Sequence, residues 1–129
     1  MIGLDTCAII DFLKGDENLI NLIGGLGEEL CLSQISYFEL SFGINPKIKS
    51  HLEEESYYDI LFNTFKIVGI DNSLFKNSSR LFWKMKSLGR EIGKIDSIIA
   101  SGFILAGVNK IITRDKHFEK IKGLKVLSY

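Results

Sequence analysis

Four carboxylic acids stand at points where the chain is predicted to pass between strands and helices. Asp5 ends the first apolar run, Glu39 lies early in a helix after the second, Asp96 lies in the first turn of a later helix, and Asp115 directly follows a short strand. Four carboxylates that share one pocket need protonation of some members or a hard divalent cation. Mg²⁺ and Mn²⁺ suit such a site, because they bind a few carboxylates and leave positions for water and substrate phosphate.

Each acid also has a local explanation. Glu39 would complete a capping box with Ser36, which precedes it in a Ser-x-x-Glu pattern. Asp96 and Asp115 stand near helix N-termini, where the helix dipole favours a negative charge by typically ~0.3–1 kcal/mol. Asp5 has no obvious capping role, since it ends a buried apolar strand. Spacing alone therefore leaves two interpretations open, independent caps and one shared metal site.

Short apolar runs alternate with amphipathic segments along the whole chain. The apolar runs predict strands over 1–5, 30–34, 65–70, 110–113 and 125–127. The amphipathic segments, bounded by cap residues and glycines, predict helices over 6–15, 16–27, 36–45, 47–63, 71–88 and 95–106. This alternation predicts an α/β fold with a central, mostly parallel sheet of about five short strands, covered on both faces. Ligands of such sheets gather outside the C-terminal ends of the strands, where the four acids are expected.

Length and composition are those of one ordinary globular domain. The 129 residues are 46% hydrophobic and 25% charged, and we interpret residues 1–129 as a single domain. The longest nearly uncharged apolar stretch, 97–108, is too short to span a bilayer, and no secretory signal is recognisable. Cys7 and Cys31 stand apart in apolar surroundings, which predicts reduced thiols in a cytoplasmic protein without membrane association.

Sixteen basic residues balance sixteen acidic ones, yet the two signs are unevenly placed. Residues 1–59 hold eleven acids and three bases, whereas residues 60–129 hold five acids and thirteen bases, which indicates a charged partner. Phe82 and Trp83 lie among these bases at a spacing that favours packing in the core or a subunit interface over stacking on nucleic-acid bases. Seven bases are candidates for RNA contact or, alternatively, solvated surface: Lys76, Arg80, Lys84, Arg90, Lys94, Arg114 and Lys116.

Four motifs, taken in order, resemble those of the PIN-domain family, and the likeness runs from Leu4 to Val126. The chain most resembles VapC-type toxins, the ribonuclease halves of toxin–antitoxin pairs. A single short motif would be a weak signal, whereas four in register are specific. The first two motifs are Leu4-Asp5-Thr6 with Ile10-Asp11-Phe12-Leu13, and Ile35-Ser36-Tyr37-Phe38-Glu39-Leu40-Ser41-Phe42-Gly43. The third and fourth are Ile95-Asp96-Ser97-Ile98-Ile99-Ala100, and Ile112-Thr113-Arg114-Asp115-Lys116-His117-Phe118 with the closing Gly123-Leu124-Lys125-Val126.

The resemblance implies a PIN-like three-layer α/β/α fold and assigns residues to roles. Thr6 and Thr113 match hydroxyl positions that orient carboxylates or water behind the ligands. Cys7 departs from the Asn that commonly stands there, and we interpret Asp11 as surface pairing or helix support rather than a metal contact. The catalytic and metal-binding quartet implied by the family is Asp5, Glu39, Asp96 and Asp115.

The resemblance also implies hydrolysis of RNA phosphodiester bonds with one or two Mg²⁺ or Mn²⁺ ions. No Ser-His-Asp or Cys-His pattern competes for the site, and we interpret His51 and His117 as structural. Water is then the nucleophile, and the metal lowers its pKa. The implied partners are an RNA substrate, a second copy of the chain in a homodimer, and a small antitoxin whose tail enters the acidic site. Segments 19–23 and 35–44 are candidates to clamp that tail.

Three alternatives belong to other functional classes or contexts. A PIN ribonuclease without an antitoxin could act in RNA processing. A non-catalytic PIN module could bind RNA or protein, although the presence of all four acids disfavours it. A flavodoxin-like signalling domain would need paired acids after the first strand and a phosphoacceptor after the third. Here Asp5 stands alone, and Asp71 in Asp71-Asn72-Ser73 is typical of a helix cap.

Overall fold

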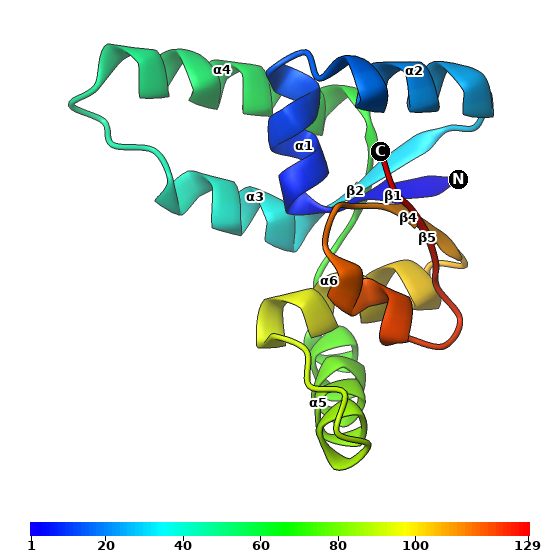
Figure 1. The fold of residues 1–129 in the computed structure, drawn as a ribbon. Helices are drawn as coiled ribbons and strands as arrows, with labels where there is room; N and C mark the ends of the chain where they lie inside the picture. The colour runs from blue at the N-terminus through cyan, green and yellow to red at the C-terminus, as the bar shows by residue number, and fades with distance from the viewer.

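The computed structural model describes all residues, 1–129, and contains one five-stranded sheet with helices on both faces (Figure 1). All neighbouring strands are parallel, in the order β3-β2-β1-β4-β5, which confirms the predicted α/β architecture. The strands are β1 (Ile2–Leu4), β2 (Leu30–Ser33), β3 (Lys66–Val68), β4 (Lys110–Ile112) and β5 (Lys125–Leu127). The helices are α1 (Thr6–Leu13), α2 (Glu17–Leu26), α3 (Gln34–Phe42), α4 (Lys49–Thr64), α5 (Asn72–Ser87), α6 (Lys94–Leu105) and the 3₁₀ helix η1 (Lys116–Lys120).

The central strand β1 lies between β2 and β4. Its register places Leu4 beside Leu32 of β2 and Ile112 of β4, so the three strands end next to one another. The chain first builds the sheet outward through β2 and β3, then crosses over to add β4 and β5 on the other side. Open α/β sheets bind their ligands at the carboxyl ends of the strands beside such a reversal. This is the edge to which β1 and β4 deliver the predicted acids.

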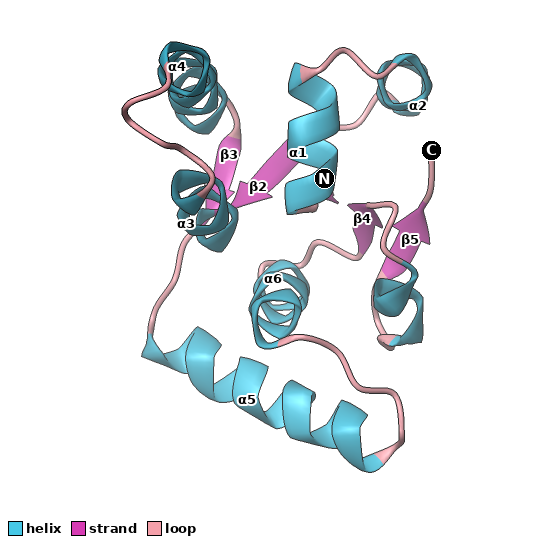
Figure 2. Cartoon of the chain, turned by 60° about the vertical axis from the view of Figure 1, so that its left-hand side comes forward, coloured by secondary structure: helices cyan, strands magenta, loops and turns pink.

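Alternating strand residues feed two hydrophobic cores, one on each face of the sheet. Leu4, Leu32 and Ile112 belong to the core under α1, α2 and α4, which lie above the sheet in Figure 1. Cys31 and Ile111 belong to the opposite core, which α5, α6 and η1 complete. Figure 2 shows α6 between the sheet and α5, so α5 forms the outer wall on that side. The three layers predicted from the sequence are therefore present.

Gly3 permits the closest approach between the sheet and α6. A Cβ atom built on Gly3 would lie 2.5 Å from the ring of Phe103, which is fully buried on α6. Any side chain at this position would push α6 away from β1. Because α6 also carries Asp96, this contact helps to set the distance between that acid and the end of β1.

Most predicted element boundaries shift by a few residues, and two helices are informative. The helix predicted over 16–27 runs through Gly24 and Gly25 as α2 and ends at Gly27 with a left-handed φ of 62°. A helical glycine costs only ~1 kcal/mol, so packing outweighs it. The third helix begins at Gln34 with Ser33 as its N-cap, so the predicted capping box between Ser36 and Glu39 is wrong. None of the helices is long and apolar enough to cross a membrane.

Candidate active site

Asp5 leaves the carboxyl end of β1 and begins α1 as its N-cap residue. Its Oδ1 accepts a hydrogen bond from the Thr6 backbone N–H at 2.7 Å, and its Oδ2 accepts one from Thr113 Oγ1 at 2.8 Å. The expectation that Asp5 has no capping role is therefore wrong, but capping occupies only one of its two oxygens. Asp5 is 5% exposed, and burial raises the pKa of its carboxyl even though hydrogen bonds oppose the rise.

Thr113 links Asp5 to the loop that carries Asp115. It follows β4, is fully buried, donates to Asp5 and accepts the Asp115 backbone N–H at 2.9 Å. Asp115 in turn caps η1, because its Oδ1 accepts the His117 N–H at 2.8 Å and lies 2.7 Å from His117 Nδ1. The short helix η1 is absent from the predicted elements. His117, interpreted as structural, lies at the edge of the acidic cluster.

Glu39 lies on α3 and is held at the site by the Thr6 hydroxyl, not by a helix-capping contact. Thr6 Oγ1 donates to Glu39 Oε1 at 2.7 Å and lies 3.0 Å from Ser36 Oγ. Ser36 is fully buried, so it fixes this contact from below. Thr6 thus contacts Glu39 as Thr113 contacts Asp5, and both hydroxyls hold acidic side chains at the carboxyl edge of the sheet.

Asp96 shows that the four acids share one electrostatic environment. It lies in the first turn of α6, partly buried, and no donor group of the protein bonds to its carboxylate. Burial is the main cause that raises the pKa of Asp96 to about 6, and the negative charges of the other three acids add to the rise. His117 acts in the opposite direction. Acids that span 111 positions of sequence therefore act on one another in the fold.

The donor set fits a hard divalent cation by its chemistry. All four groups are carboxylates, and no Lys or Arg forms an ion pair with any of them. Oxygen ligands with uncompensated negative charge are what Mg²⁺ and Mn²⁺ bind in proteins. As the side chains lie, no group of three or more His, Cys, Asp or Glu residues is close enough to hold a metal ion. The shared metal site stays a prediction.

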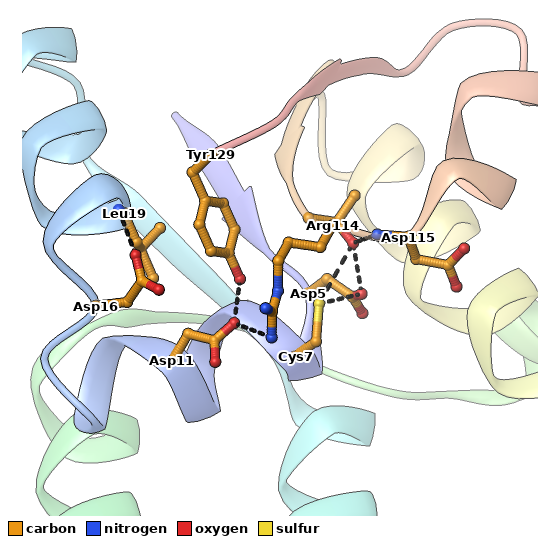
Figure 3. Close-up of polar contacts among 9 residues, drawn as sticks. Asp5, Cys7, Asp11, Asp16, Leu19, Arg114, Asp115 and Tyr129 are labelled. Atoms are coloured by element: carbon orange, nitrogen blue, oxygen red, sulfur yellow. Dashed lines mark hydrogen bonds and ion pairs between the residues drawn. The ribbon is translucent and has the colours of Figure 1, made fainter.

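Asp11 and Arg114 occupy places that the sequence did not indicate. Asp11, expected in surface pairing, is only 7% exposed, and its Oδ2 lies 2.7 Å from Arg114 Nη2. The pairing is therefore confirmed, but its surface location is wrong. Figure 3 shows the guanidinium of Arg114 turned toward Asp11 and Tyr129, on the side away from Asp115. Cys7 packs nearby, with its Sγ 3.3 Å from Asp5 Oδ2 and 3.5 Å from Thr113 Oγ1.

The remaining candidate bases lie on the outer helices and loops. Lys76, Arg80 and Lys84 follow one another at intervals of four along α5 and are exposed. Lys94 begins α6, Arg90 lies in the loop before it, and Lys116 begins η1. The structure thus places these bases around the helices that flank Asp96 and Asp115.

Two surface grooves lie near the acidic residues. A groove of about 350 Å³ between α5 and α6 is lined by Phe75, Phe82, Trp83 and Lys94. Trp83 is 61% exposed, so packing in the core of a single chain is wrong for it, whereas a subunit contact stays a prediction. A second groove of about 510 Å³ between α1, α3 and α4 opens at Thr6 and Glu39.

The wall of the second groove contains residues that the sequence did not single out. Tyr57 and Tyr58 of α4 line it opposite Ile10, Leu40 and Ile44, and Glu54 adds a second acid. Segment 35–44, expected to clamp a partner, contributes to this groove, whereas segment 19–23 of α2 lies outside it. The polarity of 47–63 was the only sequence signal that α4 would bury few of its side chains, and Tyr58 is its one buried residue.

Comparison with known proteins finds a family that matches nearly the whole chain. The family description "PIN domain" matches residues 2–124. Ribonuclease VapC1 of Methanocaldococcus jannaschii is 29% identical over 127 residues, which cover 97% of this chain and 85% of that protein. Ribonuclease VapC19 of Mycobacterium tuberculosis is 25% identical over 125 residues, or 95% of each chain.

Solved structures share the fold over their whole length. The chain resembles a crystal structure of VapBC2 from Rickettsia felis bound to a promoter DNA fragment, with a TM-score of 0.82, 24% identity, and coverage of 100% of this chain and 99% of that one. It also resembles a toxin–antitoxin complex from Klebsiella pneumoniae, with a TM-score of 0.76, 23% identity, and coverage of 98% and 96%. At these identities the likeness shows a common fold.

Proposed function

The chain belongs to the PIN-domain family, and from that premise we propose that it is an endoribonuclease, the toxin of a type II toxin–antitoxin pair. One observation of the molecule carries the proposal. The charges of Asp5, Glu39 and Asp115 all raise the pKa of Asp96, and no Lys or Arg pairs with any of the four, although His117 contacts Asp115. A protein maintains such uncompensated acids at a cost in stability, which is typical of a functional site.

The four acids would hold one or two Mg²⁺ or Mn²⁺ ions. A divalent ion bound there supplies a Lewis acid that lowers the pKa of the attacking water and offsets charge that develops on the phosphate. Thr113 fixes Asp5, and Thr6 fixes Glu39, so two of the acids are oriented before any ligand arrives. Asp96 lacks such a donor and would be the acid that gains most from a cation.

RNA would approach along the basic residues that flank the site. The exposed bases of α5 lie at helical spacing on one stripe, and Lys94, two residues before Asp96, lines the groove between α5 and α6. Lys116 lies on the other side, next to Asp115. Arg114 carries less free charge, because Asp11 compensates it. Phosphate contacts of this kind give affinity without sequence selectivity.

A small antitoxin would occupy the groove between α1, α3 and α4. Its apolar walls suit an amphipathic segment, and Glu39 and Glu54 would accept a basic side chain of that segment. We also propose a cytoplasmic homodimer of single-domain chains. The exposed Trp83 and the groove beside it are the candidate contacts between the two copies.

The proposal is tested with purified protein and a mixture of cellular RNAs in Mg²⁺. Asp5→Asn and Asp96→Asn should each remove new RNA ends that the wild type generates, because each change removes a negative oxygen at the site. Asp16→Asn is the matched control, since Asp16 caps α2 away from the site and Asn caps a helix equally well. Equal cleavage by all four proteins would overturn the proposal. A wild type that binds RNA without cutting it would favour the non-catalytic module.

A further inference from the structure

A second acidic side chain of α1 is buried beside the proposed site but has its own cation. Asp11 Oδ2 lies 2.7 Å from Arg114 Nη2 and accepts a hydrogen bond from the Tyr129 hydroxyl at 2.5 Å. The guanidinium also lies over the Tyr129 ring, 5.7 Å from its centroid. Figure 3 shows the three side chains joined in one cluster. Three segments of the chain, at α1, after β4 and after β5, therefore meet at one carboxylate.

The cluster is electrically complete, in contrast to its neighbours. Asp11 raises the pKa of Arg114, so that guanidinium stays charged. Burial, together with the bond to Asp11, raises the pKa of the Tyr129 hydroxyl, so it stays protonated and donates. One carboxylate, one guanidinium and one hydroxyl thus satisfy one another in a partly buried setting. Such charge-assisted contacts have a narrow geometry and hold the segments that carry them.

The backbone position of Arg114 connects this cluster to the proposed site. The residue before it, Thr113, donates to Asp5, and the residue after it, Asp115, is one of the four acids. The Asp115 N–H bonds back to Thr113 Oγ1, so these three residues form one tight loop between β4 and η1. The loop makes two ion pairs. Asp115 pairs with His117 of η1, and Arg114 pairs with Asp11, which ties the loop to α1.

We propose that Asp11, Arg114 and Tyr129 form a positioning clamp for the Thr113–Asp115 loop, and that the clamp sets how tightly the four acids bind a divalent cation. Its second half rests on the proposed function, whereas the first half concerns the loop alone. Arg114 is then a positioning residue that acts through Thr113 and Asp115 and makes no productive RNA contact. The clamp is the counterpart of the Thr6 contact that holds Glu39 from the other side.

The first test needs neither metal nor RNA. Amide hydrogen exchange, followed by NMR in metal-free protein, reports whether the N–H groups of Asp115 and His117 stay bonded. Arg114→Gln should speed exchange at both amides at least tenfold and leave the Leu4 amide of β1 unchanged. Arg90→Gln, the same chemical change at an exposed loop position, should change none of them. Exchange at wild-type rates in Arg114→Gln would overturn the clamp.

Two milder substitutions in the clamp test the same two amides. Should Arg114→Gln fail to fold, Tyr129→Phe removes only the hydroxyl and should produce a smaller acceleration at the same two amides. Arg114→Lys keeps a cation opposite Asp11 and should restore most of the protection that Gln loses. A Lys variant as unprotected as the Gln variant would contradict an ion-pair mechanism.

The second test separates metal positioning from RNA contact. Free Mn²⁺ is measured by electron paramagnetic resonance during titration of each protein. Arg114→Gln should weaken Mn²⁺ binding at least fivefold and lower kcat for RNA cleavage while KM stays within twofold. A raised KM with unchanged Mn²⁺ affinity would assign Arg114 to RNA contact and overturn the proposed effect of the clamp on metal binding. A wild type that binds no Mn²⁺ would instead contradict the proposed function, and the exchange result would still decide the first half.

Discussion

Asp5 and Asp11 stand six positions apart on the same short helix and are equally buried, at 5% and 7% exposure, yet their surroundings differ in charge. Asp11 faces a guanidinium, whereas Asp5 faces one hydroxyl, one backbone N–H, one thiol and the negative charge of Asp115. Burial alone therefore does not distinguish a functional acid from a structural one. The distinction lies in whether the protein supplies the opposite charge itself or leaves it for a ligand to supply.

The largest effect is expected on catalysis from the uncompensated group. Asp96→Asn should lower the rate of RNA cleavage by at least ~100-fold, because loss of a group that stabilises charge in the transition state typically costs ~10²–10³-fold. Single-turnover cleavage of end-labelled RNA gives the rate. Asp11→Asn should retain more activity than Asp96→Asn, since Asp11 makes no contact with the other acids. The opposite order would mean that the two regions have been assigned the wrong way round.

Stability should respond in the reverse order. Arg114→Ala leaves the buried Asp11 carboxylate without its cation and should lower the free energy of unfolding, because an uncompensated buried charge is destabilising. Asp96→Asn removes repulsion and should leave stability equal or higher. Urea denaturation of metal-free protein measures both changes. A loss in Asp96→Asn as large as that in Arg114→Ala would contradict the comparison.

The bases of α5 and Arg114 should differ in how they affect RNA binding. Replacing Lys76, Arg80 and Lys84 together by Gln should weaken RNA binding about tenfold at low salt and flatten its salt dependence, since fewer counterions are released. Arg114→Gln should leave the salt slope of binding unchanged, because Asp11 already neutralises its charge. Fluorescence anisotropy at several salt concentrations, on the Asp96→Asn background to prevent cleavage, gives both slopes. Equal salt slopes of RNA binding for wild type and the triple variant would show that these bases of α5 do not contact RNA.

The smallest effect is a pH dependence that belongs to the uncompensated site alone. The pKa of Asp96 is raised from 3.8 to about 6 in the folded protein, so the folded state binds its proton more tightly than the unfolded state. Stability should therefore fall as pH rises from about 4 to about 7, by about 1 kcal/mol for a partly exposed group. Thermal unfolding of metal-free protein at several pH values shows the fall. Asp96→Asn should reduce this fall and leave the part that comes from Asp5, whose pKa is also raised. A fall that Asp96→Asn leaves unchanged would point to another group.

The fold was predictable from the sequence because it depends on local signals, whereas the four acids were predicted as one site from motifs that resemble a known family. The strand at Lys125–Leu127 and the Asp71 cap of α5 follow from apolar runs and cap residues beside them. The clamp could not be predicted from the sequence, because no motif or regular spacing connects Asp11, Arg114 and Tyr129. They meet only because β4 and β5 place their following loops against α1. The prediction that Trp83 packs in the core was wrong for a related reason. Helical periodicity does not show which apolar stripe of α5 is covered within a single chain.

The role of Glu39 illustrates a competing local signal. Ser36 and Glu39 form a capping pattern, but Ser33 begins the helix one turn earlier, and Ser36 becomes a buried contact of Thr6. The same acid then faces the site through Thr6. Tertiary contacts of this kind decide which of two plausible caps is used, and the sequence by itself does not contain them.

We propose that the uncompensated acids form a metal-dependent ribonuclease site. The most direct measurement is the mapping of new RNA ends after incubation with wild type or Asp96→Asn, each with Mg²⁺ and with Mg²⁺ removed by a chelator. We expect defined new ends only for the wild type with Mg²⁺, their loss on chelation, and their return when Mg²⁺ is restored. The same ends produced by Asp96→Asn, or by the wild type without a divalent ion, would contradict the claim.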